Sequence, residues 1–279
     1  MKKFLAVFDG YKISKSTMAY AVELSATANA HLVGVFLDEF LYHSYNAVAI
    51  YKTYEKPEEV IKQLDEKDKM KRDDAVLQFQ KTCEKAKINF SIHRDRSIAL
   101  QELKLESMFA DLIIINEHEK FTQVEEKLPS RFMKELLADV QCPVLVVPEN
   151  YKPIDKIVLL YDGEPSSVYA VKMFSYLLNQ FKGVPVEVFT VNNWKTDLHL
   201  PDNKLMREFI KRHFPEATYT VTKGDAEEQI LGFLNNHKEN ELVVLGAYRR
   251  REISRWFKTS MADILMKELD TPLFIAHNN

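Results

Sequence analysis

Short apolar runs alternate along the chain with longer segments whose apolar residues recur at helical spacing. Strands buried on both faces of a parallel sheet read as such runs, because helices cover both faces. The predicted strands are 4–8, 31–37, 89–93, 112–115 and 143–147, then 156–161, 185–190, 217–221, 242–245 and 271–276. The pattern therefore predicts five strands in each half of the chain.

The segments between these runs are predicted helices. Residues 16–28 carry Met18, Ala21 and Leu24 at helical spacing, and the first half continues with helices at 58–86, 98–109 and 130–139. The second half repeats the order, with Asp202 and Asp225 placed to cap the helices that follow them. Strands alternating with helices predict an α/β fold with a doubly wound parallel sheet.

The sequence repeats itself. The stretch Phe-Leu-Ala-Val-Phe-Asp-Gly at 4–10 recurs 153 positions later as Ile-Val-Leu-Leu-Tyr-Asp-Gly, whereas 111–115 matches 241–245 at an offset of 130. The fall from 153 to 130 places 23 additional residues in the first half, between about Asp38 and Asn89. Two prolines enclose the stretch 148–153, where a regular element cannot easily continue. We therefore expect two domains, 1–150 and 151–279.

Composition narrows the classes of function. The formal net charge of −3 gives no overall attraction to nucleic acid or to anionic lipid, and no apolar run approaches the ~20 residues that span a bilayer. The opening apolar stretch is interrupted by Asp9, well short of a signal peptide. Cys83 and Cys142 have no CxxC spacing, and the eight histidines form no metal-binding pattern. These features favour a cytoplasmic protein with reduced thiols, without nucleic acid, membrane or metal partners.

Candidate chemistry lies at the carboxyl ends of the strands, where open α/β sheets bind ligands. The first strand of each half ends in Asp9-Gly10 or Asp162-Gly163, and the loop after the fourth strand begins at Asn116 or Gly246. A carboxylate at the end of the first strand can accept hydrogen bonds from a ribose. It can equally serve as a turn or capping residue, and the sequence leaves both readings open.

Over nearly its whole length the chain resembles the universal stress protein family, in a tandem two-domain form. The family's loop after strand 4 has the pattern G-x2-G-x9-G-[ST], and 246–260 matches its spacing, with Gly246 and Ser260 retained and Arg249 and Thr259 in place of two glycines. The resemblance implies two Rossmann-like sheets of the adenine nucleotide alpha hydrolase type, with strand order 3-2-1-4-5. It also implies that any nucleotide site in the second half uses Asp162, Gly163, Gly246, Arg249, Thr259 and Ser260.

The first half departs furthest from that pattern. Its corresponding positions are Asn116, Glu119, Pro129 and Ser130, so only the final hydroxyl is retained. A phosphate loop needs backbone N–H groups close to the anion, which glycine permits, whereas Glu117 and Glu119 would repel a triphosphate. We expect no nucleotide in the first half. The arginines at 249–251 leave ATP possible in the second, although such a charge run is more often a solvated surface.

Three classes of function remain open from the sequence. The first is a non-catalytic stress-response binding or scaffold protein, in which the two halves pair through their last strands as a pseudo-dimer and whole chains can pair further into homodimers. The alternative is an ATP-binding switch that uses only the second half. The third, a transferase, lacks visible partners for Asp9 and Asp162, so no catalytic residue is predicted. The aromatic insertion at 40–54 is a lid, a partner surface or a segment packed on its own domain.

Overall fold

A computed structural model describes residues 1–37, 45–95, 98–122, 125–192, 198–236, 240–246 and 260–277. The strands of the first half are β1 (Lys3–Phe8), β2 (His31–Leu37), β3 (Phe90–Asp95), β4 (Leu112–Asn116) and β5 (Val144–Val147). Its helices are α1 (Lys15–Ala28), α2 (Ala47–Thr53), α3 (Pro57–Ala86), α4 (Ala99–Ser107) and α5 (Arg131–Asp139). The strand order predicted for this half and its four predicted helices are confirmed, whereas α2 lies in the insertion and was not predicted.

The second half repeats the alternation of strands and helices. Its strands are β6 (Lys156–Leu160), β7 (Val186–Asn192), β8 (Thr218–Lys223), β9 (Glu241–Gly246) and β10 (Leu273–Ala276). Its helices are α6 (Pro165–Leu177), the 3-10 helix η1 (Asn179–Gly183), α7 (Asn203–His213), α8 (Ala226–Asn236) and α9 (Met261–Glu268). All ten predicted strands are present.

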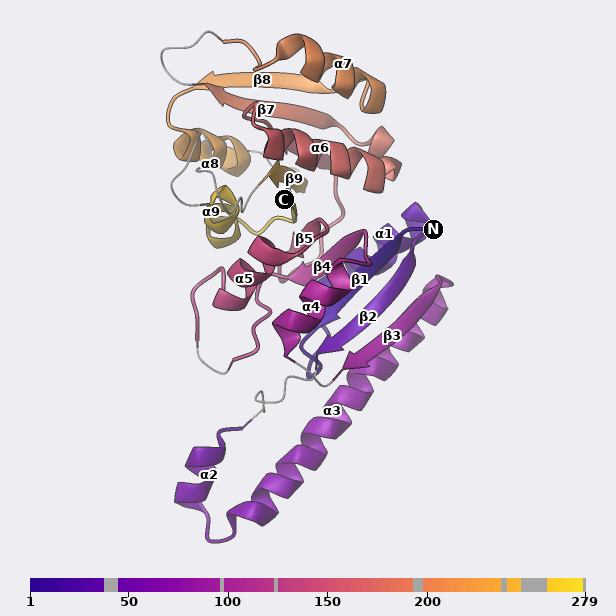
Figure 1. The fold of residues 1–279 in the computed structure, drawn as a ribbon, viewed down its shortest axis with the longest axis vertical. Helices are drawn as coiled ribbons and strands as arrows, with labels where there is room; N and C mark the ends of the chain where they lie inside the picture. Colours follow the sequence, from indigo (N-terminus) through magenta and orange to yellow (C-terminus); the bar gives the residue numbers. More distant parts are fainter. Residues whose placement is uncertain are drawn as a thin grey trace.

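The strands form one continuous ten-stranded sheet, in the order β3-β2-β1-β4-β5-β10-β9-β6-β7-β8. Each half therefore has the predicted order 3-2-1-4-5, and all pairs within a half are parallel. The halves meet where β10 pairs antiparallel with β5, with Leu273 opposite Val146 and Ile275 opposite Val144. The two predicted sheets are thus joined edge to edge, and Figure 1 shows the second half stacked above the first.

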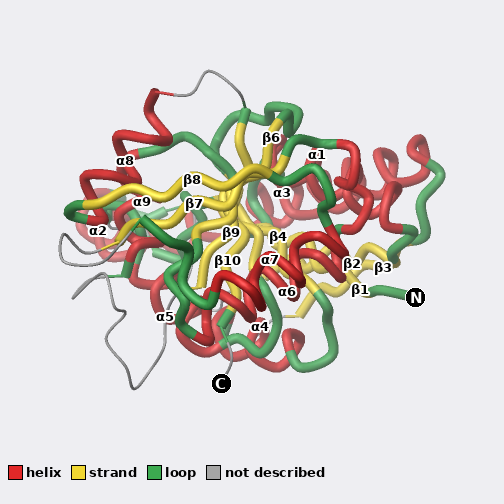
Figure 2. The backbone as a smooth tube through the Cα atoms, turned by 90° about the horizontal axis from the view of Figure 1, so that it is seen from above, coloured by secondary structure: helices red, strands yellow, loops and turns green. Residues whose placement is uncertain are grey.

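Helices cover both faces of this sheet (Figure 2). Side chains of α1, α3, α6 and α7 belong to one hydrophobic core, and side chains of α4, α5, α8 and α9 belong to the other. Each core runs across both halves. Leu145 of β5 and Phe274 of β10 lie in the first core, and Val144 of β5 and Ile275 of β10 lie in the second core. The central strands, buried on both faces, explain why their signal in the sequence is apolar and continuous, whereas the edge strands β3 and β8 are only partly buried.

The insertion of the first half forms a helical arm. Helix α3 spans 30 residues, against 11 for α7 at the equivalent place, and α2 precedes it. Only the later part of α3 packs on the sheet, through Phe79 and Cys83, while Ile50 of α2 is buried on the arm itself. In Figure 1 the arm extends away from the body of the protein. Tyr51 and Tyr54 stay exposed, so the arm packs on its own domain only in part.

The two predicted aspartate caps differ in outcome. Asp225 accepts a hydrogen bond from the backbone N–H of Glu228 at 3.1 Å, as the first turn of α8 requires. Asp202 precedes α7 but makes no side-chain cap bond, so that part of the prediction is wrong. Its backbone is left-handed, with φ at 43°, whereas a capping residue is usually extended.

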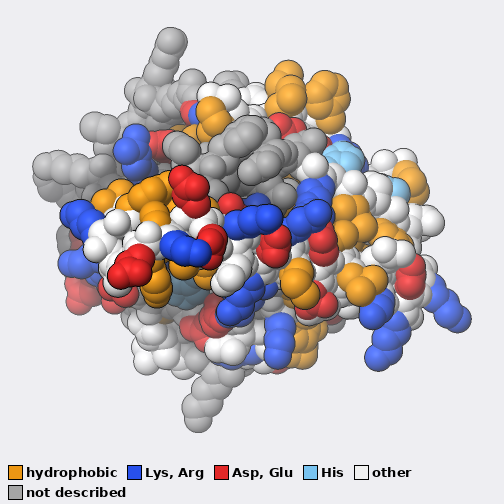
Figure 3. All heavy atoms as spheres, turned by 90° about the horizontal axis from the view of Figure 1, so that it is seen from below, with side chains coloured by type: hydrophobic (Ala, Val, Ile, Leu, Met, Phe, Trp, Pro, Cys, Tyr) orange, Lys and Arg blue, Asp and Glu red, His pale blue; other side chains and the backbone are white. Residues whose placement is uncertain are grey.

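The described surface shows no large area of one charge in the view from below, where basic and acidic side chains are interspersed (Figure 3). Mixed charge gives this face little long-range attraction for a highly charged partner. Among the described residues, no helix is long and apolar enough to cross a membrane.

Candidate functional site

The end of β1 is a tight turn organised by Asp9. Its Oδ1 accepts hydrogen bonds from the backbone N–H of Tyr11 at 2.9 Å and of Lys12 at 3.1 Å. Gly10 has φ at 81°, a left-handed conformation that glycine adopts without steric cost. Partial burial raises the pKa of the Asp9 carboxyl, against the two backbone hydrogen bonds, which lower it. In the first half, Asp9 therefore makes the contacts of a turn residue.

The end of β6 repeats this turn with a more buried carboxylate. Asp162 is 7% exposed, and its Oδ1 accepts hydrogen bonds from the Glu164 N–H at 2.9 Å and from the Ser167 hydroxyl at 2.6 Å. Gly163 has the same positive φ as its counterpart in the first half. No described residue donates to Oδ2 of Asp162. That oxygen keeps the capacity to accept a hydrogen bond from a ligand hydroxyl.

Gly246 ends β9 directly against the start of α6. A Cβ added to it would lie 2.4 Å from the carbonyl carbon of Ser166 and 2.7 Å from the amide nitrogen of Ser167. These neighbours are backbone atoms, which cannot swing aside as a side chain would. Glycine is therefore required here for close packing of strand on helix, whether or not a phosphate binds nearby.

The remaining predicted residues of the second-half site lie around the loop that follows β9. Ser260 stands at the N-terminal end of α9, and its Oγ is buried without a hydrogen-bond partner among the described residues. Arg249 and Thr259 lie outside the described residues. The structure thus places Asp162 and Gly163 after β6, Gly246 at the end of β9 and Ser260 before α9, each at the strand or helix end expected from the sequence.

The equivalent loop of the first half is filled by its own side chains. Asn116 ends β4 and donates a hydrogen bond to the Pro148 carbonyl at 3.1 Å. Ser130 caps α5 by accepting from the Met133 N–H and also donates to the Glu119 carbonyl. The hydroxyl retained from the family pattern is thus occupied within the protein.

Two glutamates of this loop are buried. Glu117 is 6% exposed and Glu119 is 8% exposed. Burial, with Asp270 and Glu149 nearby, raises the pKa of Glu117 to about 8. Burial, followed by the charges of Asp9 and Glu149, raises the pKa of Glu119 well above its usual range, and Lys12 opposes this only weakly. Desolvation and like charges both favour the protonated form of a carboxyl group.

Sequence reasoning missed Glu149 and Asp270. Glu149 follows β5, and Asp270 precedes β10 in the other half of the chain. The two residues flank the strand ends that the antiparallel register brings together, where Leu273 lies opposite Val146. The sequence predicted that the last strands of the two halves pair. It gave no register for that pair, so it could not indicate which residues flank the joined strand ends.

Polar chemistry beyond these loops is limited. Among the residues that the structure describes, no group of three or more His, Cys, Asp or Glu side chains is arranged to hold a metal ion. Burial raises the pKa of both Cys83 and Cys142 to about 12, which disfavours the reactive thiolate. His118 lies 3.4 Å from Glu117, and no described contact joins it to a nucleophile. The described cysteines and His118 therefore form no nucleophile and base pair with each other.

Comparisons with known proteins give the fold. No protein-family model matches the sequence, and no curated protein matches it. Among solved structures, a universal stress protein from Archaeoglobus fulgidus DSM 4304 superposes with a TM-score of 0.70 at 13% identity, covering 99% of this chain and 98% of that one. A functionally unknown protein from Pseudomonas aeruginosa PAO1 gives a TM-score of 0.60 at 12% identity, covering 99% and 92%.

Both similarities extend over both halves of the chain. The fold is therefore that of a tandem universal stress protein, and the resemblance predicted from the repeat and the loop spacing is confirmed at the level of the fold. At such low identity the role of a particular residue must be argued from this chain alone.

Proposed function

We propose that this protein is a tandem universal stress protein that acts by binding, without a catalytic step of its own, and that its first half has lost nucleotide binding. The observation that carries the proposal is the buried Glu119, which lies close enough to Asp9 to raise its own pKa further. In the family pattern this loop position holds a glycine near phosphate. A carboxyl side chain there fills space and adds negative charge when it ionises, and the backbone N–H of Glu119 already donates to the Asn116 carbonyl at 3.1 Å.

Pairing of the halves is part of this proposal. Two hydrogen bonds between the halves accompany the β5–β10 ladder. The Tyr20 hydroxyl donates to the Lys152 carbonyl at 2.8 Å, and Lys2 Nζ donates to the Leu177 carbonyl at 2.6 Å. We infer that residues 1–150 and 151–279 act as an intramolecular pseudo-dimer. The proposal extends to whole chains, which can pair into a homodimer.

One observation favours a second candidate, an ATP-binding switch in the second half. The buried Oγ of Ser260 has no partner among the described residues, and Oδ2 of Asp162 receives no hydrogen bond from them. Buried polar atoms without partners are uncommon and call for an explanation, such as a bound ligand. In this candidate Asp162 and Gly163 would hold the ribose, and Gly246, Arg249, Thr259 and Ser260 would face the phosphates.

Calorimetric titration with ATP and ADP separates the candidates. The protein, an Asp9→Asn variant and an Asp162→Asn variant are titrated up to millimolar nucleotide. We expect at most one site per chain. If that site is present, it is lost in Asp162→Asn and kept in Asp9→Asn, which supports the switch. Absence of binding in all three proteins supports the scaffold.

A different result would refute the loss of the first-half site. Two sites per chain, or a site lost in Asp9→Asn but kept in Asp162→Asn, would show that nucleotide binds beside Glu119 despite its burial. Thermal unfolding of each variant without nucleotide serves as the control for folding, because both aspartates organise turns.

A further inference from the structure

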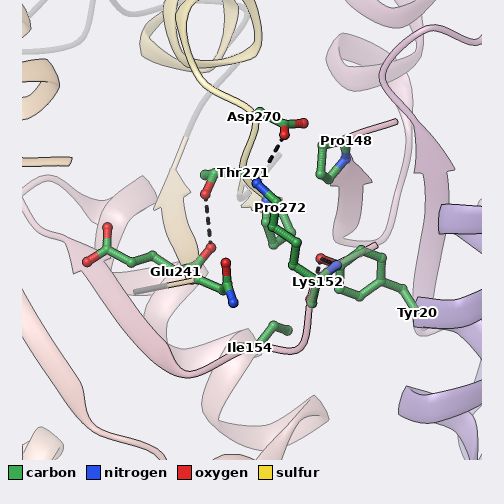
Figure 4. Close-up of a pocket in the computed structure, with 9 residues that line it drawn as sticks. Tyr20, Pro148, Lys152, Ile154, Glu241, Asp270, Thr271 and Pro272 are labelled. Atoms are coloured by element: carbon green, nitrogen blue, oxygen red, sulfur yellow. Dashed lines mark hydrogen bonds and ion pairs between the residues drawn. The ribbon is translucent and has the colours of Figure 1, made fainter. Parts of the chain in front are cut away.

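A small hollow lies at the joint between the halves. It measures about 60 Å³, enough for a few water molecules. Figure 4 shows Lys152 and Asp270 beside it, 3.2 Å apart as an ion pair, and the Thr271 hydroxyl donating to the Glu241 carbonyl at 3.1 Å. These groups are already paired with one another, so this hollow belongs to the joint and offers a larger ligand no room.

A much larger hollow lies on the helical surface of the first half. It is a groove of about 450 Å³ between α1 and α3, within the range of about 300–1,000 Å³ that is typical of sites for small molecules. Neither Asp9 nor the loop 116–130 lines it, so it is separate from the strand ends described above. Its apolar lining residues are Ile13, Met18, Ala19 and Val22.

Two charged residues line this groove, and they stand apart along α1. Lys15 is the first residue of the helix, and Glu23 lies about 12 Å further along its axis. Glu23 accepts a hydrogen bond from the Tyr151 hydroxyl at 2.6 Å, whereas Lys15 is exposed and has no ion-pair partner among the described residues. The first turn of α1 carries no acidic residue, so the positive end of the helix dipole adds to the charge of Lys15. An anionic group is therefore favoured at this end of the groove.

The second half fills the corresponding space with its own rings. Between α6 and α7, the helices that follow its first two strands, the ring centroids of Tyr176 and His213 lie 5.3 Å apart. Phe209 lies 4.6 Å from the same histidine ring. In the first half, α3 lines the groove with Gln78 and Thr82, which carry no ring. A place that aromatic rings occupy in one half is thus open in the other.

We propose that the groove between α1 and α3 binds a small, flat aromatic molecule that carries a negative charge. Its rings pack on Met18, Ala19 and Val22, in the kind of place that the rings of the protein itself fill in the second half. Its anionic group lies beside Lys15. Burial of the rings supplies most of the affinity, because apolar surface leaves water, and the lysine orients the ligand. The first half thus keeps a ligand site of its own, away from the strand ends.

Anilinonaphthalene sulfonate, which has aromatic rings and a sulfonate group, is the probe for this groove. Titration of the full-length protein, followed by probe fluorescence, should show a saturable site. Ala19→Phe places a ring in the groove and should weaken that binding at least about tenfold. The control Ala138→Phe makes the same change at a half-buried position of α5, on the opposite face of the sheet, and should leave binding unchanged. No saturable binding, or binding that Ala19→Phe does not weaken, overturns the proposal.

A second pair of substitutions tests the negative charge of the ligand. Lys15→Gln should weaken binding of the sulfonate probe about threefold, the size of effect expected for an exposed ion pair. Binding of phenylnaphthylamine, which has the same rings and no sulfonate, should not change in this variant. The control Lys204→Gln removes an exposed lysine from the first turn of α7 and should affect neither probe. An equal loss for both probes in Lys15→Gln would overturn the assignment of an anionic ligand.

Thr82→Phe keeps the test decisive if Ala19→Phe folds poorly. Thr82 is exposed on α3, so a ring at this position fills the groove from its other wall and should also weaken binding at least about tenfold. Sedimentation without probe tests a different occupant, a second copy of the chain. We expect the unchanged and the filled proteins to sediment alike. A dimer that dissociates in either filled variant would show that another chain covers the groove, and would overturn the proposal.

Discussion

Gly246→Ala is expected to lower the free energy of unfolding by about 3 kcal/mol, at the upper end of the range for overpacked sites. The added Cβ would lie 2.4 Å from the Ser166 carbonyl carbon and 2.5 Å from its oxygen, distances that force the start of α6 away from β9. Since Ser167 donates to Asp162, that shift also disturbs the carboxylate of the second-half site. Urea denaturation followed by circular dichroism measures the loss.

Gly232→Ala is the matched control for this substitution. Gly232 lies within α8, and a Cβ added there meets no atom within 4 Å. Alanine is the better helix former, so this variant should gain roughly 0.5–1 kcal/mol. A Gly246→Ala protein that is as stable as the unchanged protein would show that β9 and α6 do not approach each other as described.

Glu119→Gln is expected to stabilise the protein at pH 8 more than at pH 4. The unfolded chain ionises this residue above about pH 4.3, whereas in the folded protein burial and Asp9 hold its pKa well above that value. The folded state therefore loses stability relative to the unfolded state as pH rises through this window. Glutamine has the same size and no charge, so it removes that loss.

Unfolding free energies of both proteins at pH 4, 6 and 8 test the sign. The difference in favour of Glu119→Gln should be close to zero at pH 4 and should grow towards pH 8. Glu216→Gln, at an exposed site, should show no such trend. A Glu119→Gln protein that is less stable than the unchanged protein at pH 8 would mean that the carboxylate is ionised and usefully paired in the fold.

Much of the fold could be predicted because its strands are short and buried on both faces. Continuous apolar runs such as 112–115 and 144–147 leave few alternatives once helical segments separate them. The repeat then placed Asn116 and Gly246 at equivalent strand ends, and Ser130 and Ser260 at equivalent helix starts. Local pattern and internal symmetry were sufficient for these assignments.

Properties that depend on packing between distant segments could not be predicted from the sequence. Asp202 has the residue type of a cap, but its left-handed backbone prevents the expected bond. Gly246 has the residue type of a phosphate loop, yet its contact with α6 is a sufficient reason for glycine at that place. The register of β10 on β5 depends on how the two halves pack, which no local pattern encodes.

Photolabelling with an azido-ATP, followed by mass spectrometric mapping of the labelled peptides, tests the central claim most directly. The account predicts that any label that excess ATP competes away lies in the second half, and that the peptides containing Asp9 and Glu119 stay unlabelled. Competed label on either of those first-half peptides would contradict it, since a buried glutamate beside the first strand end would then be compatible with a bound triphosphate.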